Sequence, residues 1–180
     1  GIAKAKSEII DNIIENGSII LNADDKFYNY FKLKAQKRKL KIVSFSKKNK
    51  SDVKLEKIKR QENVSIAKIN IYGKSRDFII KKNLEIYVDN ILASLAVISN
   101  FLDLKIINNK FFFNYNVPEG RGDTKIVRIN SKKIHLVDES YNSNPLSLDL
   151  ALKNFDKVTS NYKRKIILLG DMLELGKFSK

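Results

Sequence analysis

Two polar stretches, each placed directly after an apolar run, carry the side chains of this 180-residue chain that are best suited to chemistry. The first is Asp138-Glu139-Ser140-Tyr141-Asn142-Ser143-Asn144-Pro145, and the second is Gly170-Asp171-Met172-Leu173-Glu174-Leu175-Gly176. Carboxylates at the carboxyl end of a strand commonly accept hydrogen bonds from ribose hydroxyls. Because neighbouring residues of a strand face opposite ways, at most one of Asp138 and Glu139 points at a given ligand. Capping of the following loop is an equally good interpretation of these carboxylates.

The residues between the two stretches predict a helix. Asn144 suits a helix N-cap, and Pro145 suits the first helical position, where no N–H is needed. Apolar residues then recur at near-helical spacing up to Phe155. The apolar runs at 134–137 and 165–169 therefore flank a helix, and this order favours parallel strands joined by a right-handed crossover. Ligands of such sheets bind at the carboxyl ends of the strands, where both polar stretches lie.

The rest of the chain also alternates between helical and strand patterns. We expect a helix over 2–14 closed by Asn16-Gly17, a strand over 18–22, a helix over 27–35 capped by Asp24 and Asp25, and a strand over 40–45. Strands over 53–58, 65–72 and 76–80, with a turn at Gly73-Lys74, are expected to pair antiparallel. A buried helix over 88–102 and a hairpin of 125–129 with 133–137 follow. This order predicts an α/β protein.

The best domain boundary lies in the stretch from Asn116 to Asp123, which contains Pro118, Gly120 and Gly122. We therefore expect one domain over 1–116 and a second over 117–180. The chain opens inside a helical pattern without an initiator Met and stops directly after the second polar stretch. Both ends are therefore expected to be cut edges of a longer protein.

Composition limits the class of protein. The hydrophobic share of 43% is typical of a globular protein, and the absence of Cys excludes disulfides and thiolate metal sites and suits a cytosolic protein. No uninterrupted apolar run has the length of a membrane span, so no membrane partner is expected. The net charge of +15 invites a nucleic-acid interpretation. Since the lysines are scattered, we interpret the charge as a solvated background, which leaves a basic nucleic-acid-binding module as the non-enzyme alternative.

Two further motifs favour structural roles. Gly73-Lys74-Ser75 resembles the end of a phosphate-binding loop, but Lys68 stands where that motif needs Gly, and the tripeptide lies between two strands. A hairpin turn is the better interpretation. His135 is the only histidine and has no ligand partner at suitable spacing, so we expect it to be structural.

Taken together, several stretches resemble the Mur ligases of peptidoglycan synthesis. The resemblance is carried by residues 138–145 and 168–176, and by Ala3-Lys4-Ala5-Lys6-Ser7-Glu8-Ile9, Leu21-Asn22-Ala23-Asp24-Asp25 and Gly120-Arg121-Gly122. The Tyr-Asn-x-Asn-Pro core is most similar to the member that joins D-alanyl-D-alanine to UDP-N-acetylmuramoyl-tripeptide. The resemblance implies the remainder of a central ATPase domain, with a mixed sheet and an antiparallel part, followed by the start of a Rossmann-like C-terminal domain.

The resemblance also implies the chemistry. ATP phosphorylates the carboxylate of the tripeptide, and the amine of D-alanyl-D-alanine attacks the acyl phosphate through a tetrahedral intermediate. ATP and Mg²⁺ are the implied cofactors, and positive groups stabilise the developing charge. A sibling amide ligase, meaning another Mur ligase or a folylpolyglutamate synthetase, is the enzyme alternative. The implied enzyme is cytoplasmic and monomeric, without nucleic-acid or membrane partners.

The family's functional residues map onto seven positions. Lys6 matches a lysine that is carbamylated and helps to hold magnesium. Asn90 matches a contact to adenine, although Ile86 replaces the His usual four residues earlier. Arg121 matches an arginine on the nucleotide phosphates, and Glu139 a carboxylate on the ribose. Tyr141, Asn142 and Asn144 would line the substrate cleft. The family's phosphate-binding loop has no counterpart in these 180 residues, so this chain alone is expected to be inactive.

Overall fold

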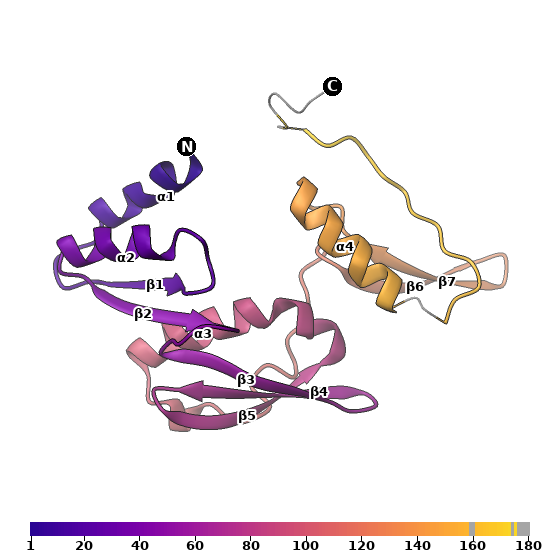
Figure 1. Cartoon of the computed structure of the whole chain (residues 1–180). Coiled ribbons are helices and arrows are strands. Elements are labelled where there is room, and N and C mark those ends of the chain that lie inside the picture. The colour runs from indigo at the N-terminus through magenta and orange to yellow at the C-terminus, as the bar shows by residue number, and fades with distance from the viewer. Residues whose placement is uncertain (159–160, 174, 176–180) are drawn as a thin grey trace. The chain divides into compact units, whose positions relative to one another are not determined.

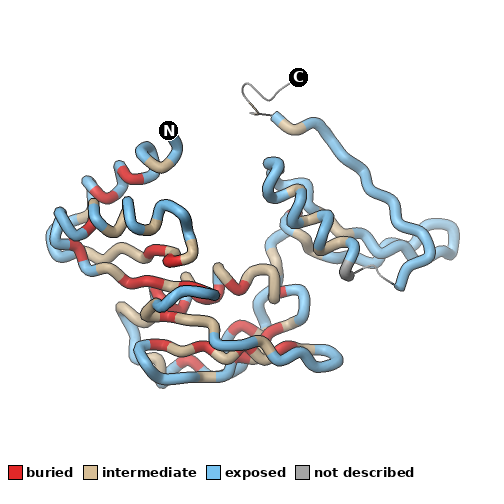
Figure 2. Tube along the Cα trace, in the orientation of Figure 1, coloured by how far each residue is buried: buried red, intermediate tan, exposed pale blue. Residues whose placement is uncertain are grey.

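The computed structural model describes residues 1–158, 161–173 and 175 (Figure 1). The chain divides into two compact units, Gly1–Tyr115 and Asn116–Lys180. The first unit contains nearly all of the buried core, as Figure 2 shows.

The first unit is built on a five-stranded mixed sheet in the order β1-β2-β3-β4-β5. The strands are β1 (Ser18–Asn22), β2 (Lys41–Ser46), β3 (Val53–Arg60), β4 (Val64–Ile71) and β5 (Lys74–Lys81). β1, β2 and β3 run parallel, whereas β3, β4 and β5 pair antiparallel. The predicted α/β class with an antiparallel part is confirmed.

Helices cover both faces of the parallel part of this sheet. α1 (Ile2–Asp11) and α2 (Tyr28–Lys37) form a cluster in which Ile10, Ala35 and Leu40 are buried against Ile19 and Ile42. Ile19 and Ile42 are register partners on one face. Val43 follows Ile42 and is buried on the opposite face, which α3 (Val88–Phe101) covers (Figure 1). Short 3₁₀ turns, η1 (Lys82–Tyr87) and η2 (Leu104–Ile106), flank α3.

The first helix ends earlier than its apolar stripe predicted. The C-cap is Asn12, whose side-chain amide donates to the Glu8 carbonyl, and Asn16-Gly17 instead forms the turn into β1, with Asn16 at φ 61°. Ile13 still packs on the α1–α2 cluster, while Ile14 is 79% exposed. The apolar stripe therefore continues past the end of the helix, with Ile13 on the cluster and Ile14 in solvent.

A two-residue turn closes the β4–β5 hairpin. Tyr72 and Gly73 join β4 to β5 with φ of 48° and 85°, which is the geometry whose twist matches that of the flanking strands. The predicted turn at Gly73 is thus confirmed. β4 alternates half-buried and buried residues along its whole length, as expected of a strand with one face on the core.

α3 is the core helix of the first unit. By length and mean hydropathy, Lys82–Phe101 would suffice to span a membrane. Its side chains Val88, Ile91, Leu92, Leu95 and Ala96 are buried, and the helix contacts β1, β2 and β3. A core helix against a sheet accounts for this apolar character.

The second unit contains a hairpin and one helix. β6 (Asp123–Ile129) and β7 (Lys132–Asp138) pair antiparallel around Asn130-Ser131, and α4 (Pro145–Val158) follows. The predicted strand over 165–169 is wrong, because these residues have no strand assignment and no pairing, and Leu168 is 91% exposed. A strand needs a partner that supplies its hydrogen bonds, and in the described part of this unit β6 and β7 pair only with each other.

Candidate functional site

The open end of the β6–β7 hairpin holds the polar residues of the second unit together. Asp123 and Asp138 are register partners in the last pair of the ladder, so the segments beyond them leave the sheet side by side. The Gly122 N–H donates to the Asp138 carbonyl over 2.7 Å, and the Tyr141 N–H donates to the Gly120 carbonyl over 3.0 Å. Segments 120–122 and 138–141, which are far apart in sequence, therefore form one backbone-linked site.

Gly120 is required at this crossing of the two segments. Its φ is +73°, a conformation that other residues rarely adopt, and a Cβ there would lie 3.1 Å from the Tyr141 nitrogen and 3.2 Å from the Tyr141 Cβ. Gly120 is itself buried. A side chain at this position would push the two segments apart.

The two segments place Arg121 against Tyr141. The guanidinium carbon of Arg121 lies 4.1 Å from the centroid of the Tyr141 ring. A guanidinium over an aromatic face is held by the ring quadrupole and by flat contact. The guanidinium of Arg121 is a planar fork of donors whose geometry matches that of a phosphate group.

Three carboxylates surround the same loop and differ in their electrostatics. Hydrogen bonds from the Ser140 side chain and backbone lower the pKa of Asp138, and the Ser140 N–H lies 3.0 Å from Asp138 Oδ1. Asp123 accepts from the Gly120 N–H over 2.6 Å. Partial desolvation raises the pKa of Glu139, and repulsion from Asp123 and Asp138 adds to it. Asp123 and Asp138 are thus engaged by the loop itself, which leaves Glu139 as the carboxylate of this group suited to an external ligand.

Asn144 caps α4. Its Oδ1 accepts from the N–H groups of Leu146 and Ser147 over 3.1 and 2.9 Å, and the Ser147 hydroxyl accepts from the Asn144 N–H over 2.9 Å. This reciprocal arrangement satisfies donors at the start of the helix. The side-chain oxygen of Asn144 is therefore occupied, while Asn142 is exposed. Of the two, Asn142 is the side chain that can meet a substrate.

Lys6 and Asn90 lie on different helices of the first unit. Lys6 is exposed on α1, next to buried Ser7, whose carbonyl accepts from Lys34 Nζ over 2.9 Å. Asn90 is exposed in the first turn of α3. Its neighbour Asp89 pairs with Lys47 Nζ over 2.5 Å. The two helices cover opposite faces of the sheet, so the fold of this unit does not bring Lys6 and Asn90 together by direct packing.

Asp24 organises the loop at the carboxyl end of β2, a role that sequence reasoning missed. Its carboxylate accepts from Lys47 N over 2.6 Å, from Ser46 Oγ over 2.8 Å and from Asn49 N over 3.1 Å. Burial raises the pKa of Asp24, but these hydrogen bonds outweigh it and the net pKa is lowered. Asp25 alone serves the turn before α2, accepting from the Phe27 N–H over 2.7 Å. The polar residues at 46–49, directly after a strand, were the available signal.

The residues of this site suit a nucleotide better than they suit a magnesium ion. A guanidinium and a carboxylate on two linked segments, as Arg121 and Glu139 are, suit the phosphates and ribose of a nucleotide. Among the residues that the structure describes, no group of three or more His, Cys, Asp or Glu side chains could hold a metal ion. Magnesium prefers near-octahedral oxygen ligands, so these residues do not by themselves make a magnesium site.

Comparison with known proteins agrees with the fold. Residues 1–98 match the family model of the Mur ligase middle domain. A UDP-N-acetylmuramoyl-tripeptide–D-alanyl-D-alanine ligase of Buchnera aphidicola subsp. Baizongia pistaciae is 31% identical over 180 residues, covering 98% of this chain and 37% of that protein. A protein of the same name from Buchnera aphidicola subsp. Acyrthosiphon pisum is 29% identical over 194 residues, covering 99% and 38%. The chain thus spans little more than a third of these relatives.

Solved structures show the same fold. MurF from Acinetobacter baumannii superposes with a TM-score of 0.67 at 23% identity, over 82% of this chain and 31% of that one. MurF ligase from Thermotoga maritima, crystallised in complex with ADP, superposes with a TM-score of 0.64 at 19% identity, over 84% and 33%.

Proposed function

This chain belongs to the Mur ligase family, and we propose that it is part of the ATP-dependent ligase that adds D-alanyl-D-alanine to UDP-N-acetylmuramoyl-tripeptide in peptidoglycan synthesis. Two relatives that bear this name align with almost the whole chain. The observation that carries the proposal at the site is the linked pair of segments in which Arg121 and Glu139 lie at one end of the β6–β7 hairpin.

The two units correspond in this proposal to two domains. Residues 1–116 are the second half of the central ATP-binding domain, and residues 117–180 are the first part of the C-terminal ligase domain. The match of residues 1–98 to the middle-domain model supports the first assignment. The division of the chain after Tyr115 supports the boundary.

Three residues are proposed to contact the nucleotide. Arg121 donates two parallel hydrogen bonds to phosphate oxygens and compensates the charge that develops during phosphoryl transfer. Glu139 accepts from the ribose hydroxyls, and partial desolvation together with the charges of Asp123 and Asp138 raises its pKa. Asn90 contacts the adenine. Asp89, the preceding residue of the helix, forms an ion pair with Lys47.

The substrate contacts are Tyr141 and Asn142, with Asn144 placing their loop by capping α4. The tripeptide carboxylate becomes an acyl phosphate, and attack by the dipeptide amine then gives a tetrahedral intermediate that expels inorganic phosphate. Exposed Asn142 can donate its amide hydrogens to substrate oxygens.

Magnesium, when bound with ATP, neutralises phosphate charge and orients the transferred group. Lys6 is exposed and therefore accessible to carbon dioxide, and a carbamate on Nζ would be one oxygen ligand among several. The described residues supply no complete set around it. Carbamylation of Lys6 is therefore proposed as a contribution to a magnesium site whose other ligands these residues do not supply. The ligase is proposed to act in the cytoplasm as a monomer.

The assay uses the protein encoded by the whole reading frame that contains these residues. With UDP-N-acetylmuramoyl-tripeptide and ATP, we expect phosphate release to depend on D-alanyl-D-alanine. The amino-acid substrates of the sibling Mur ligases, and folate with glutamate, should give no product. Faster turnover with a sibling's substrates would assign the chain to that sibling instead.

The 180-residue chain alone should neither hydrolyse ATP nor form the amide, because its sequence contains no complete phosphate-binding loop. Phosphate release by the purified chain, measured with ATP and magnesium in the presence of both substrates, should stay at the level of buffer. ATP-dependent ligation by this chain would contradict the expectation.

A further inference from the structure

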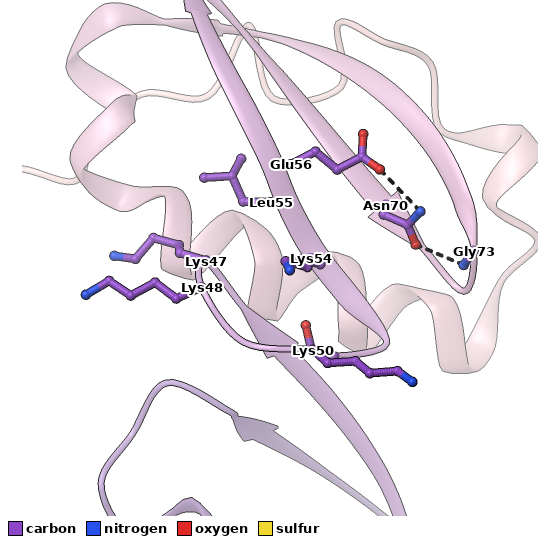
Figure 3. A pocket seen from close by; sticks show the side chains of 9 residues that line it. Lys47, Lys48, Lys50, Lys54, Leu55, Glu56, Asn70 and Gly73 are labelled. Atoms are coloured by element: carbon purple, nitrogen blue, oxygen red, sulfur yellow. Dashed lines mark hydrogen bonds between the residues drawn. The ribbon is translucent and has the colours of Figure 1, made fainter.

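Four lysines of the first unit line one groove. Lys47, Lys48 and Lys50 come from the loop after β2 and Lys54 from β3, and the turn at Gly73 closes the far side (Figure 3). The groove has a volume of about 690 Å³ and is open to solvent. In the sequence these residues belong to a lysine content spread over the chain, whereas the fold concentrates them on one concave surface.

The backbone that carries the first lysines is held in place. Asp24 accepts hydrogen bonds from the N–H groups of Lys47 and Asn49, and Ser46 Oγ accepts from the N–H groups of Lys48 and Asn49. The loop therefore keeps its shape without using the lysine ammonium groups. Their placement does not depend on a ligand to order the backbone.

The groove carries an excess of positive charge. Among the described residues that line the groove, Glu56 is the one carboxylate; it accepts from Ser75 Oγ over 2.7 Å and lies 3.8 Å from Lys68 Nζ. Lys47 is paired with Asp89. Within the described ranges, none of the ion pairs involves Lys48, Lys50 or Lys54. Three ammonium groups are therefore available to an anion.

A second hollow of about 390 Å³ adjoins the groove. It shares Lys50 and Ser51 with the groove and adds Tyr28 and Lys32 from α2. Lys32 Nζ lies 5.7 Å from the centroid of the half-buried Tyr28 ring. Asp52 also lines this hollow, and its carboxylate accepts from the N–H and the hydroxyl of Ser44. The two hollows together form a strip with five lysines, two carboxylates that are hydrogen-bonded within the protein, and an aromatic side chain at one end.

We propose that this strip, lined by Lys32, Lys47, Lys48, Lys50 and Lys54, binds the sugar–phosphate backbone of a single-stranded nucleic acid. Figure 3 shows Lys47 and Lys48 extending to one side of the loop and Lys50 to the other, so the charges are spread out rather than convergent on one phosphate. Spread lysines along an open groove track a polyanion without reading its sequence. Tyr28 offers a face on which a base stacks.

Fluorescence anisotropy of the 180-residue chain with a labelled 20-nucleotide oligothymidylate tests the proposal. The variant K48Q/K50Q/K54Q removes the three unpaired groove lysines. The matched control K37Q/K41Q/K59Q removes the same charge at exposed positions that line neither hollow.

The wild type should bind saturably at 50 mM NaCl. The groove variant should bind at least ~10-fold more weakly and lose about 2 from the slope of log K against log salt, since each contact to a single strand contributes about 0.7. The control should change less than twofold.

Three results would overturn the proposal: no saturable binding by the wild type at 50 mM NaCl, equal weakening in both variants, or competition by polyglutamate as effective as by unlabelled oligonucleotide. Equal weakening would assign binding to diffuse charge, and polyglutamate competition would make the groove a site for acidic polymers in general. Circular dichroism checks that each variant is folded. If the triple variant loses its helical signal, K48Q/K50Q, both at exposed loop positions, takes its place against K37Q/K41Q.

Discussion

The guanidinium carbon of Arg121 lies 4.1 Å from the centroid of the Tyr141 ring. The residue before Arg121 takes part in the same crossing of segments, because the Tyr141 N–H donates to the Gly120 carbonyl. The backbone contact that joins segment 120–122 to segment 138–141 therefore also brings the Tyr141 ring within reach of the guanidinium. In the proposed ligase, Tyr141 would act on the nucleotide through Arg121 as well as on the substrate side of the loop.

Replacing Tyr141 by Leu should release the Arg121 side chain, whereas Phe should retain it. A cation–π contact at an exposed site is worth about 0.5–1 kcal/mol. NMR relaxation of the Arg121 Nε–H should show increased motion in Y141L and wild-type behaviour in Y141F. Unchanged relaxation in Y141L would mean that the ring does not hold the guanidinium.

Replacing Gly120 by Ala should open the site, and Gly73 offers a matched control. Both have positive φ, but a Cβ on Gly73 meets nothing within 4 Å, whereas one on Gly120 meets Tyr141 at 3.1 Å. G73A should cost only the left-handed backbone penalty, about 1–2 kcal/mol in local opening free energy. G120A should cost more and speed hydrogen exchange at the Tyr141 amide. Hydrogen exchange at each turn measures the local opening free energy of the two variants. Equal losses in G73A and G120A would show that the contact between an added Cβ at position 120 and Tyr141 costs nothing.

Replacing Asp24 by Asn should loosen the loop over 46–49. The Asp24 pKa is lowered from 3.8 in the folded state, so its ionised form stabilises the fold above that value, and the stabilisation is lost as the pH falls through the lower folded pKa. At pH 7 the variant should lose about 1–3 kcal/mol. Its urea midpoint should vary less with pH below about 4 than that of the wild type. A parallel acid dependence in both proteins would rule out Asp24 as its source.

The pKa values of Glu139 and Asp138 should be shifted in opposite directions from those of free carboxyl groups. The pKa of Glu139 lies above 4.5 and that of Asp138 below 3.8. A raised carboxyl pKa means that the stability from neutral Glu139 is present below 4.5 and is lost as the pH rises through the folded pKa. Replacing Asp123 by Asn removes one repulsive charge and should lower the Glu139 pKa. Carbon-13 NMR of the carboxyl groups measures both, and an unchanged Glu139 value in D123N would exclude Asp123 as a cause.

Replacing Asn144 by Ala should fray the start of α4, whereas N142A should not. Loss of an Asn cap costs about 1 kcal/mol. Hydrogen exchange at the Leu146 and Ser147 amides, which donate to Asn144, should speed up only in N144A. In the complete ligase, N142A should raise the KM for D-alanyl-D-alanine or the tripeptide. Faster exchange in N142A would instead give Asn142 a structural role.

The sequence by itself determined the elements whose patterns are local. Strand β1 over Ser18–Asn22, the turn at Gly73 and the cap at Asn144 could be predicted, because backbone geometry and side-chain alternation decide them within a few residues. The α/β class and the family followed from the order of these elements and from two polar stretches. The roles of Lys6, Asn90, Arg121, Glu139, Tyr141 and Asn142 came from resemblance and stay predictions.

Only the tertiary structure decided which distant residues meet. Asp24 could be taken for a helix cap because nothing local shows that the loop over 46–49 turns back to it across a parallel strand pair. An apolar run such as 165–169 predicts a strand, but a strand exists only where a neighbour supplies its hydrogen bonds. The Arg121–Tyr141 stack and the lysine-lined groove likewise depend on register and on loop closure. Register and loop closure are set by the packing of one segment against another, and the sequence of a single segment does not determine that packing.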